Sequence, residues 1–202
     1  MKIIELVLDE DNLEENNGIT AISIVENPAI EEDFIALKNQ EFKFAEQDKE
    51  KRILMGAALV PNKPIYRKSG EEEYYIFFSK DTVRKASELF FIKGNQSEST
   101  LEHESPLEGL TIVESWIVEG EQDKSRHYGL NAPIGTWMVS MKVNNDDVWN
   151  NYVSTGKVKG FSIEAYFSSK LEQRPKDKTL KEEAAAQEFI NTISKILKES
   201  NE

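Results

Sequence analysis

The chain has 202 residues, a formal net charge of -12, two histidines and no cysteine. The lack of cysteine excludes disulfides, a thiol nucleophile and thiolate metal sites, and the histidines do not form the His-x-x-x-His pair of zinc hydrolases. The acidity makes nucleic acid a poor partner, because each phosphate contact needs a local lysine or arginine.

No apolar run approaches the ~20 residues that cross a membrane. The amino terminus lacks the basic-then-apolar order of a signal peptide. We therefore expect no membrane attachment and a location in the cytoplasm of the cell that makes the protein. No residue pattern indicates a cofactor or a metal site. The length suits one domain with appendages.

The amino-terminal part contains two short β-prone runs, at residues 1–9 and 19–25, separated by an acidic, asparagine-rich stretch. This pattern predicts a hairpin or a pair of strands, which form an amino-terminal leader over residues 1–45. The polar stretch 38–52 has few apolar anchors and predicts a linker or a mobile helix.

A mainly β domain is predicted over residues 52–169. Its helix over 82–91 can be capped by Ser79 or Asp81, because either side-chain oxygen can accept from the free N–H groups at a helix start. A further short helix is predicted at 146–153. Many strands with few helices favour an antiparallel barrel flanked by helices over the βαβ order of a parallel sheet. The predicted strands are 53–60, 74–78, a strand bearing His103, 110–118, 139–143 and 159–167.

The carboxy-terminal tail differs in composition. Residues 170–179 are almost without apolar side chains and predict a linker. Residues 180–202 carry apolar side chains at helical spacing and predict an amphipathic helix, which docks either on the barrel or on a partner.

Residues 159–167 alternate between apolar and other side chains, so Ser162 and Glu164 lie on one face of a strand. A serine hydroxyl needs a base to become a nucleophile, and His103 is the natural candidate. Glycine flanks Ser162 on one side only, unlike a Gly-x-Ser-x-Gly elbow. Because most strand serines have no catalytic role, the residue pattern alone leaves the function open.

Six segments carry a resemblance to a known family: His103-Glu104, Gly109, 113–119, 128–130, 133–138 and 160–164. Together they resemble the procapsid (prohead) maturation proteases of tailed bacteriophages, serine proteases distantly related to herpesvirus assemblins. The resemblance implies an assemblin-like β-barrel and a serine endopeptidase without a cofactor. It also implies that Ser162 is the nucleophile and His103 the general base. The implied substrates are the phage scaffold and major capsid proteins, and the chain itself, which are cleaved inside the assembling procapsid. Residues 18–30 resemble the amino-terminal segment of a phage subgroup of such proteases.

The third catalytic residue has two main candidates. Glu114 follows His103 on the next predicted strand and is preferred. Glu164 is the alternative. It lies ~6.5 Å from Ser162 along the strand, so it reaches the histidine only if the ring lies obliquely. Glu104 and His127 are weaker candidates.

Three functions remain open at this stage. The presence of both His103 and Ser162 favours the protease. A catalytically inactive structural or scaffold-associated head protein of the same fold is the alternative, and an esterase is a weaker one, because a Ser/His pair does not specify the acyl group. Whether the chain forms a homo-oligomer is also left open.

Overall fold

The computed structural model describes residues 2–8, 17–29, 35–37 and 51–169. Apart from Ser169, these residues belong to one compact unit, Met1–Ser168. The linker and amphipathic helix predicted for residues 170–202 lie outside the described residues, as does most of the stretch 38–52. Within the described part of the chain, no helix has the length and apolar character needed to span a membrane.

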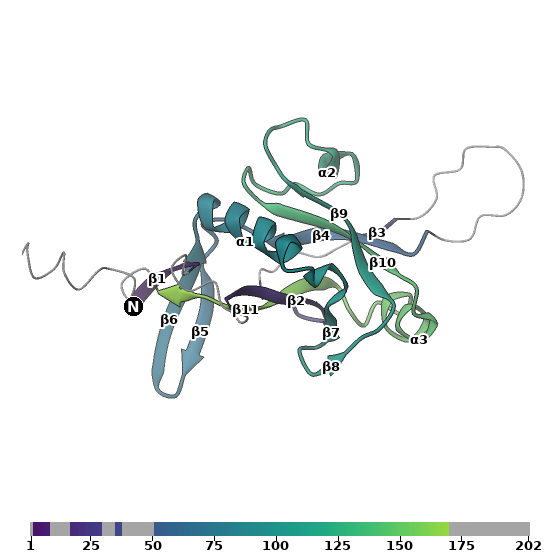
Figure 1. Cartoon of the computed structure of the whole chain (residues 1–202), viewed down its shortest axis with the longest axis horizontal. Helices are drawn as coiled ribbons and strands as arrows, with labels where there is room; N and C mark the ends of the chain where they lie inside the picture. Colours follow the sequence, from purple (N-terminus) through teal and green to yellow (C-terminus); the bar gives the residue numbers. More distant parts are fainter. Residues whose placement is uncertain (1, 9–16, 30–34, 38–50, 170–202) are drawn as a thin grey trace, which may run out of the picture. The chain divides into compact units, whose positions relative to one another are not determined.

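Strands dominate the described residues and form three four-stranded sheets (Figure 1). The first sheet has the order β12 (Ser168–Ser169), β1 (Lys2–Val7), β6 (Glu72–Phe78) and β5 (Ile65–Ser69). The second has the order β3 (Ile35–Leu37), β4 (Ile53–Leu59), β10 (Trp137–Val143) and β9 (Leu110–Ile117). The third has the order β11 (Gly160–Tyr166), β2 (Gly18–Val25), β7 (Ser99–Leu101) and β8 (Ser105–Pro106).

Helices are few and mostly short. The longest described helix is α1 (Lys80–Ile92), followed by α2 (Lys124–His127) and α3 (Asp146–Val148), which continues into a π-helical turn, Trp149–Val153. A 3-10 turn covers Asn95–Ser97. The predicted mainly β class with few helices is therefore confirmed. The expected closed barrel is not formed by the described strands, because each of the three sheets keeps two edge strands.

The predicted pairing of the first two strands is wrong. β1 pairs in parallel with β6 in the first sheet, whereas β2 pairs antiparallel with β11 and in parallel with β7 in the third sheet. Parallel pairs need long connections rather than a tight turn, so adjacency in sequence gave no guide to these partners. The strands of the predicted leader are thus part of the same sheets as the strands of the predicted protease domain.

Helix α1 follows its sequence signals. The Ser79 side chain accepts from the backbone N–H of Thr82, as predicted for the cap. Val83 and Phe90 are fully buried, and the Phe90 ring meets the Trp137 ring edge-on at 5.4 Å between centroids. Burying a side chain of this size contributes about 1.5–3 kcal/mol, so this face fixes the helix against the core.

The third sheet has two unlike faces. Ile22, Ile24 and Phe161 are fully buried in the core. The register places Ser23 opposite Ser162 on β11 and opposite Thr100 on β7. Because directly opposed residues share a face and successive residues alternate, the polar side chains gather on the face away from this apolar core.

Candidate active site

His103 lies in the tight turn between β7 and β8, not on a strand as predicted. Glu102 and His103 both have left-handed backbone conformations, with φ of 53° and 62°. Positive φ at both central residues is typical of two-residue hairpin turns, where Asn-Gly is the usual pair. A residue with a Cβ costs roughly 1–2 kcal/mol in this conformation. Backbone strain is therefore present at His103, the candidate base predicted from the sequence, and strained residues often cluster at functional sites.

Hydrogen bonds hold this turn against the end of β2. The Glu102 N–H donates to the carbonyl of Ile24 at 3.2 Å, and the Glu104 N–H donates to the carbonyl of Leu101 at 3.0 Å. The Glu102 carboxylate accepts from the Glu26 N–H at 2.7 Å. These contacts offset the backbone strain and fix the imidazole over the polar face of the sheet.

A cluster of polar side chains surrounds the imidazole. Ser23 Oγ lies 2.9 Å from His103 Nδ1, 3.0 Å from Glu164 Oε1 and 2.7 Å from Thr100 Oγ1. Thr100 also donates a short hydrogen bond to Glu164 Oε1. The direct separation between His103 Nδ1 and Glu164 Oε1 is 3.5 Å. Strands β2, β7 and β11 and the turn thus each contribute one member.

Ser162 lies beside this cluster. It is opposite Ser23 in the register of β2 and β11, where the Cβ atoms of a pair lie about 4.5–5.5 Å apart. Ser162 is 8% exposed, and its hydroxyl has no hydrogen-bond partner among the described residues. Ser162 therefore lies directly opposite the serine that contacts the imidazole.

The two candidates for the third residue occupy different places. Glu164 reaches the histidine in spite of its position two residues after Ser162. The register of β11 against β2 shifts directly after Glu164, and such a bulge bends a strand and re-aims its side chains.

Glu114 lies on β9, in the second sheet, and not at the histidine. Its carboxylate pairs with Lys124 at 2.8 Å and accepts from Ser140 Oγ at 2.6 Å. These hydrogen bonds, the one from Lys124 first, lower the pKa of Glu114 below its ordinary value. Both contacts are to Oε2, so the carboxylate belongs to a local network on β9.

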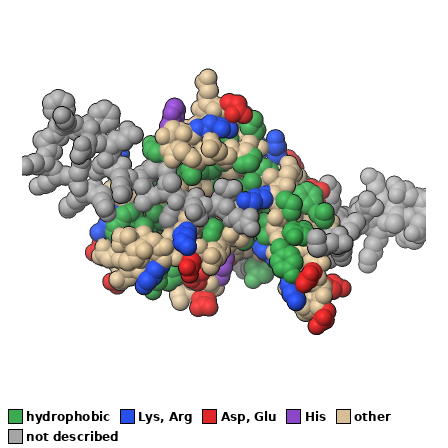
Figure 2. Space-filling view, turned by 180° about the vertical axis from the view of Figure 1, so that it is seen from behind, with side chains coloured by type: hydrophobic (Ala, Val, Ile, Leu, Met, Phe, Trp, Pro, Cys, Tyr) green, Lys and Arg blue, Asp and Glu red, His purple; other side chains and the backbone are tan. Residues whose placement is uncertain are grey.

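The weaker candidates do not join the cluster. Glu104 follows the histidine in the turn, and His127 is the last residue of α2. Histidine side chains reach the surface at well-separated positions in Figure 2. The structure thus brings together His103, Ser162 and Glu164 and leaves the other candidates elsewhere.

Ser23 and Thr100 are the members of the cluster that sequence reasoning missed. Ser23 is a small polar residue between Ile22 and Ile24 on a strand that is otherwise almost wholly buried. A polar side chain at such a position needs hydrogen-bond partners, and this was the available signal. The identity of these hydrogen-bond partners depends on neighbouring strands that are distant in sequence.

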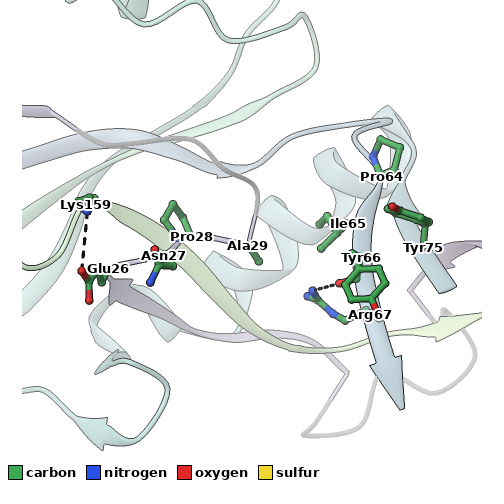
Figure 3. A pocket seen from close by; sticks show the side chains of 10 residues that line it. All are labelled: Glu26, Asn27, Pro28, Ala29, Pro64, Ile65, Tyr66, Arg67, Tyr75 and Lys159. Atoms are coloured by element: carbon green, nitrogen blue, oxygen red, sulfur yellow. Dashed lines mark hydrogen bonds and ion pairs between the residues drawn. The ribbon is translucent and has the colours of Figure 1, made fainter. Parts of the chain in front are cut away.

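A surface groove of about 640 Å³ begins next to the turn that carries His103 (Figure 3). Glu26, which is bonded to Glu102 of the turn, lies at one end with Lys159, and their charged groups are 4.0 Å apart. Arg67 lies at the other end, donates to the Tyr66 carbonyl at 3.0 Å, and has no carboxylate partner among the described residues. The remaining lining residues are Asn27, Pro28, Ala29, Pro64, Ile65 and Tyr75.

Metal chemistry gains no support from the described residues, in which no group of histidine, aspartate and glutamate side chains could hold an ion. The chemistry that the cluster offers is proton transfer and nucleophilic attack. A hydroxyl beside an imidazole that is in turn oriented by a carboxylate has the geometry of an activated serine.

The comparisons with known proteins agree with this geometry. Residues 41–171 match the family described as "Putative phage serine protease XkdF". This segment is more than half of the chain, and the chain belongs to that family. No curated protein and no solved structure matches the chain. The family supports a serine-protease role, and the relationship to assemblins stays a prediction.

Proposed function

We propose that this member of a phage serine-protease family is an endopeptidase of phage head maturation. Ser162 is the nucleophile, His103 is the general base and Glu164 is the carboxylate that stabilises the charged imidazole. The observation that carries the proposal is the position of the His103 ring, with Nδ1 3.5 Å from the Glu164 carboxylate and 2.9 Å from Ser23, the residue directly opposite Ser162.

Two serines lie near the ring, and their surroundings distinguish them. Ser23 is wholly inaccessible to solvent and its hydroxyl contacts three polar groups. Ser162 keeps 8% of its surface exposed and its hydroxyl is uncommitted within the described residues. A nucleophile must reach a substrate carbonyl, so Ser162 is the better assignment.

The proposed reaction follows from these positions. His103 Nε2 takes the proton of Ser162 Oγ as that oxygen attacks the peptide carbonyl. The imidazolium gives this proton to the leaving amine when the C–N bond breaks, which leaves an acyl-enzyme. Water then attacks the ester with the same nitrogen as base, and the imidazolium returns a proton to Ser162 Oγ as the ester C–O bond breaks and the carboxyl product leaves. The Glu164 carboxylate stabilises each imidazolium stage.

The substrates proposed are the phage scaffold protein and the major capsid protein, cleaved inside the assembling procapsid. The groove beside the catalytic turn supports a polypeptide substrate, because it combines exposed aromatic surface at Tyr66 with a cationic end at Arg67. Arginine without an acidic partner favours an acidic side chain on the substrate.

Co-expression with the scaffold and capsid genes, followed by mass spectrometry of new protein termini, tests the function. Ser162→Ala and His103→Ala should each abolish processing, since the two act as one unit. The matched control is Ser69→Ala, which removes an exposed strand hydroxyl elsewhere. Undiminished processing by either site variant contradicts the assignment. If the unmodified chain also processes nothing, the alternative of an inactive head protein gains support.

A further inference from the structure

Ser23 lies outside the segment 41–171 that matches the protease family, yet it is the hub of the cluster. It is fully buried on strand β2, and its hydroxyl has three polar neighbours within 3.0 Å: Thr100, His103 and Glu164. A serine hydroxyl has one proton to donate and two lone pairs to accept. This hydroxyl therefore has one proton and two lone pairs for three neighbours inside the cluster.

The carboxylate determines which way the protons point. A carboxylate can only accept, so Ser23 Oγ donates to Glu164 Oε1, as Thr100 Oγ1 also does. If Ser23 instead donated to the imidazole, its oxygen would face the carboxylate at 3.0 Å without a proton between them. Hydrogen bonds to a charged acceptor are the stronger ones, so the first arrangement is favoured.

The direction of the Ser23 proton determines the tautomer of the His103 imidazole. With its proton committed to the carboxylate, Ser23 Oγ can only accept from His103 Nδ1, at 2.9 Å. The neutral ring must then carry its proton on Nδ1, which leaves Nε2 as the basic nitrogen. The direct distance of 3.5 Å from Nδ1 to the carboxylate is longer than a good N–H···O hydrogen bond. The serine bridges that gap.

We propose that Ser23 is a positioning residue that links His103 to Glu164 and locks the imidazole in the tautomer with the proton on Nδ1. Its catalytic consequence rests on the proposed function, because the free Nε2 is the base for Ser162. The effect of Ser23 on the His103 ring does not depend on the proposed function. A strand from outside the matched segment thereby completes the site.

The tautomer can be measured directly, because the chain has only two histidines. In uniformly ¹⁵N-labelled full-length His127→Gln protein, the remaining ring is His103, and long-range ¹H–¹⁵N correlation spectra distinguish a protonated from an unprotonated ring nitrogen. For the neutral ring, we expect a single form with the proton on Nδ1. Ser23→Ala should convert this to a mixture of both forms.

Ser162→Ala is the matched control, since it removes the neighbouring serine hydroxyl on the same face and should leave the tautomer unchanged. If Ser23→Ala does not fold, Ser23→Cys keeps nearly the same volume with a weak hydrogen-bonding group and should also release the lock. A proton on Nε2 in the parent protein, or an unchanged single form in folded Ser23 variants, overturns the proposal.

Activity gives a second readout if the protease assignment holds. Ser23→Ala should lower kcat roughly tenfold to a hundredfold with little change in KM, because it removes one hydrogen bond to an ionic network and no substrate contact. An unchanged kcat contradicts a positioning role in catalysis. If no substrate is cleaved by the parent protein, the proposed function fails, while the tautomer measurement still decides the role of Ser23.

Discussion

The replacement Glu164→Gln tests the charge in the site most directly. Glutamine keeps the size and shape of the side chain, and its amide oxygen can still accept from Ser23 and Thr100. What is lost is the negative charge 3.5 Å from His103 Nδ1. Since that charge stabilises the imidazolium and not the neutral ring, its loss should appear in kcat.

The size of the loss follows from the geometry. Two unit charges 3.5 Å apart interact by about 5 kcal/mol at an effective dielectric constant of about 20 and by about 1 kcal/mol in bulk water. The Glu164 side chain is 31% exposed, so the real value lies between these limits. At about 1.4 kcal/mol per tenfold in rate, we expect kcat to fall between about fivefold and about three-thousandfold.

The assay is the kcat and KM of purified protein on the polypeptide that co-expression identifies as the substrate. Glu114→Gln is the control, because it makes the same chemical change on β9, where the carboxylate is bound by Lys124 and Ser140. It should leave kcat within about twofold, in line with surface changes away from a site. A larger loss for Glu114→Gln than for Glu164→Gln would refute the reasoning and return the role to Glu114.

Three further predictions concern charge, substrate binding and backbone strain. Lys124 lowers the pKa of Glu114, so Glu114→Gln should lower the free energy of unfolding by about 0.2–1 kcal/mol at pH 7. In urea titrations this difference should disappear as the pH falls from 4.5, the ordinary pKa, through the lower pKa of the folded state. Arg67→Glu should raise KM for an acidic polypeptide about twofold to fivefold with kcat unchanged in steady-state assays, as for an exposed charge pair; an unchanged KM would exclude the cationic end of the groove from binding. Gly135→Ala should destabilise the fold by about 1–3 kcal/mol in thermal unfolding, because a Cβ is strained at this positive φ, whereas Gly120→Ala, where nothing lies within 4 Å, should be nearly neutral.

Local patterns in the sequence predicted the parts of the structure that depend on local forces. The cap at Ser79 and the buried face of α1 follow from hydrogen bonding and from helical spacing, and both are found. The alternation over residues 159–167 correctly placed Ser162 and Glu164 on one strand face. Each of these features is decided within a few residues of chain.

The arrangement of the site depended on contacts that no local pattern contains. Ser23 lies 80 residues from His103 and 141 residues from Glu164 along the chain. Alternation gives the face of a strand but not the identity of its neighbours, so β2 could be predicted as a strand and still be paired with the wrong partner. Glu114 was preferred because it follows His103 on the next predicted strand. Nearness along the chain did not predict nearness in space, and the carboxylate found at the histidine is that of Glu164.

The strained turn at His103 connects the folding of β2 to the chemistry. Two consecutive left-handed residues cost roughly 2–4 kcal/mol together, and the turn is held by the carbonyl of Ile24 and the N–H of Glu26, both at the end of β2. The same strand supplies Ser23 to the imidazole. If β2 left the sheet, the turn would lose the bonds that offset its strain and the ring would lose its partner in one step. The proposed activity should therefore depend on the pairing of β2 with β11 and β7, although β2 lies outside the segment that matches the family.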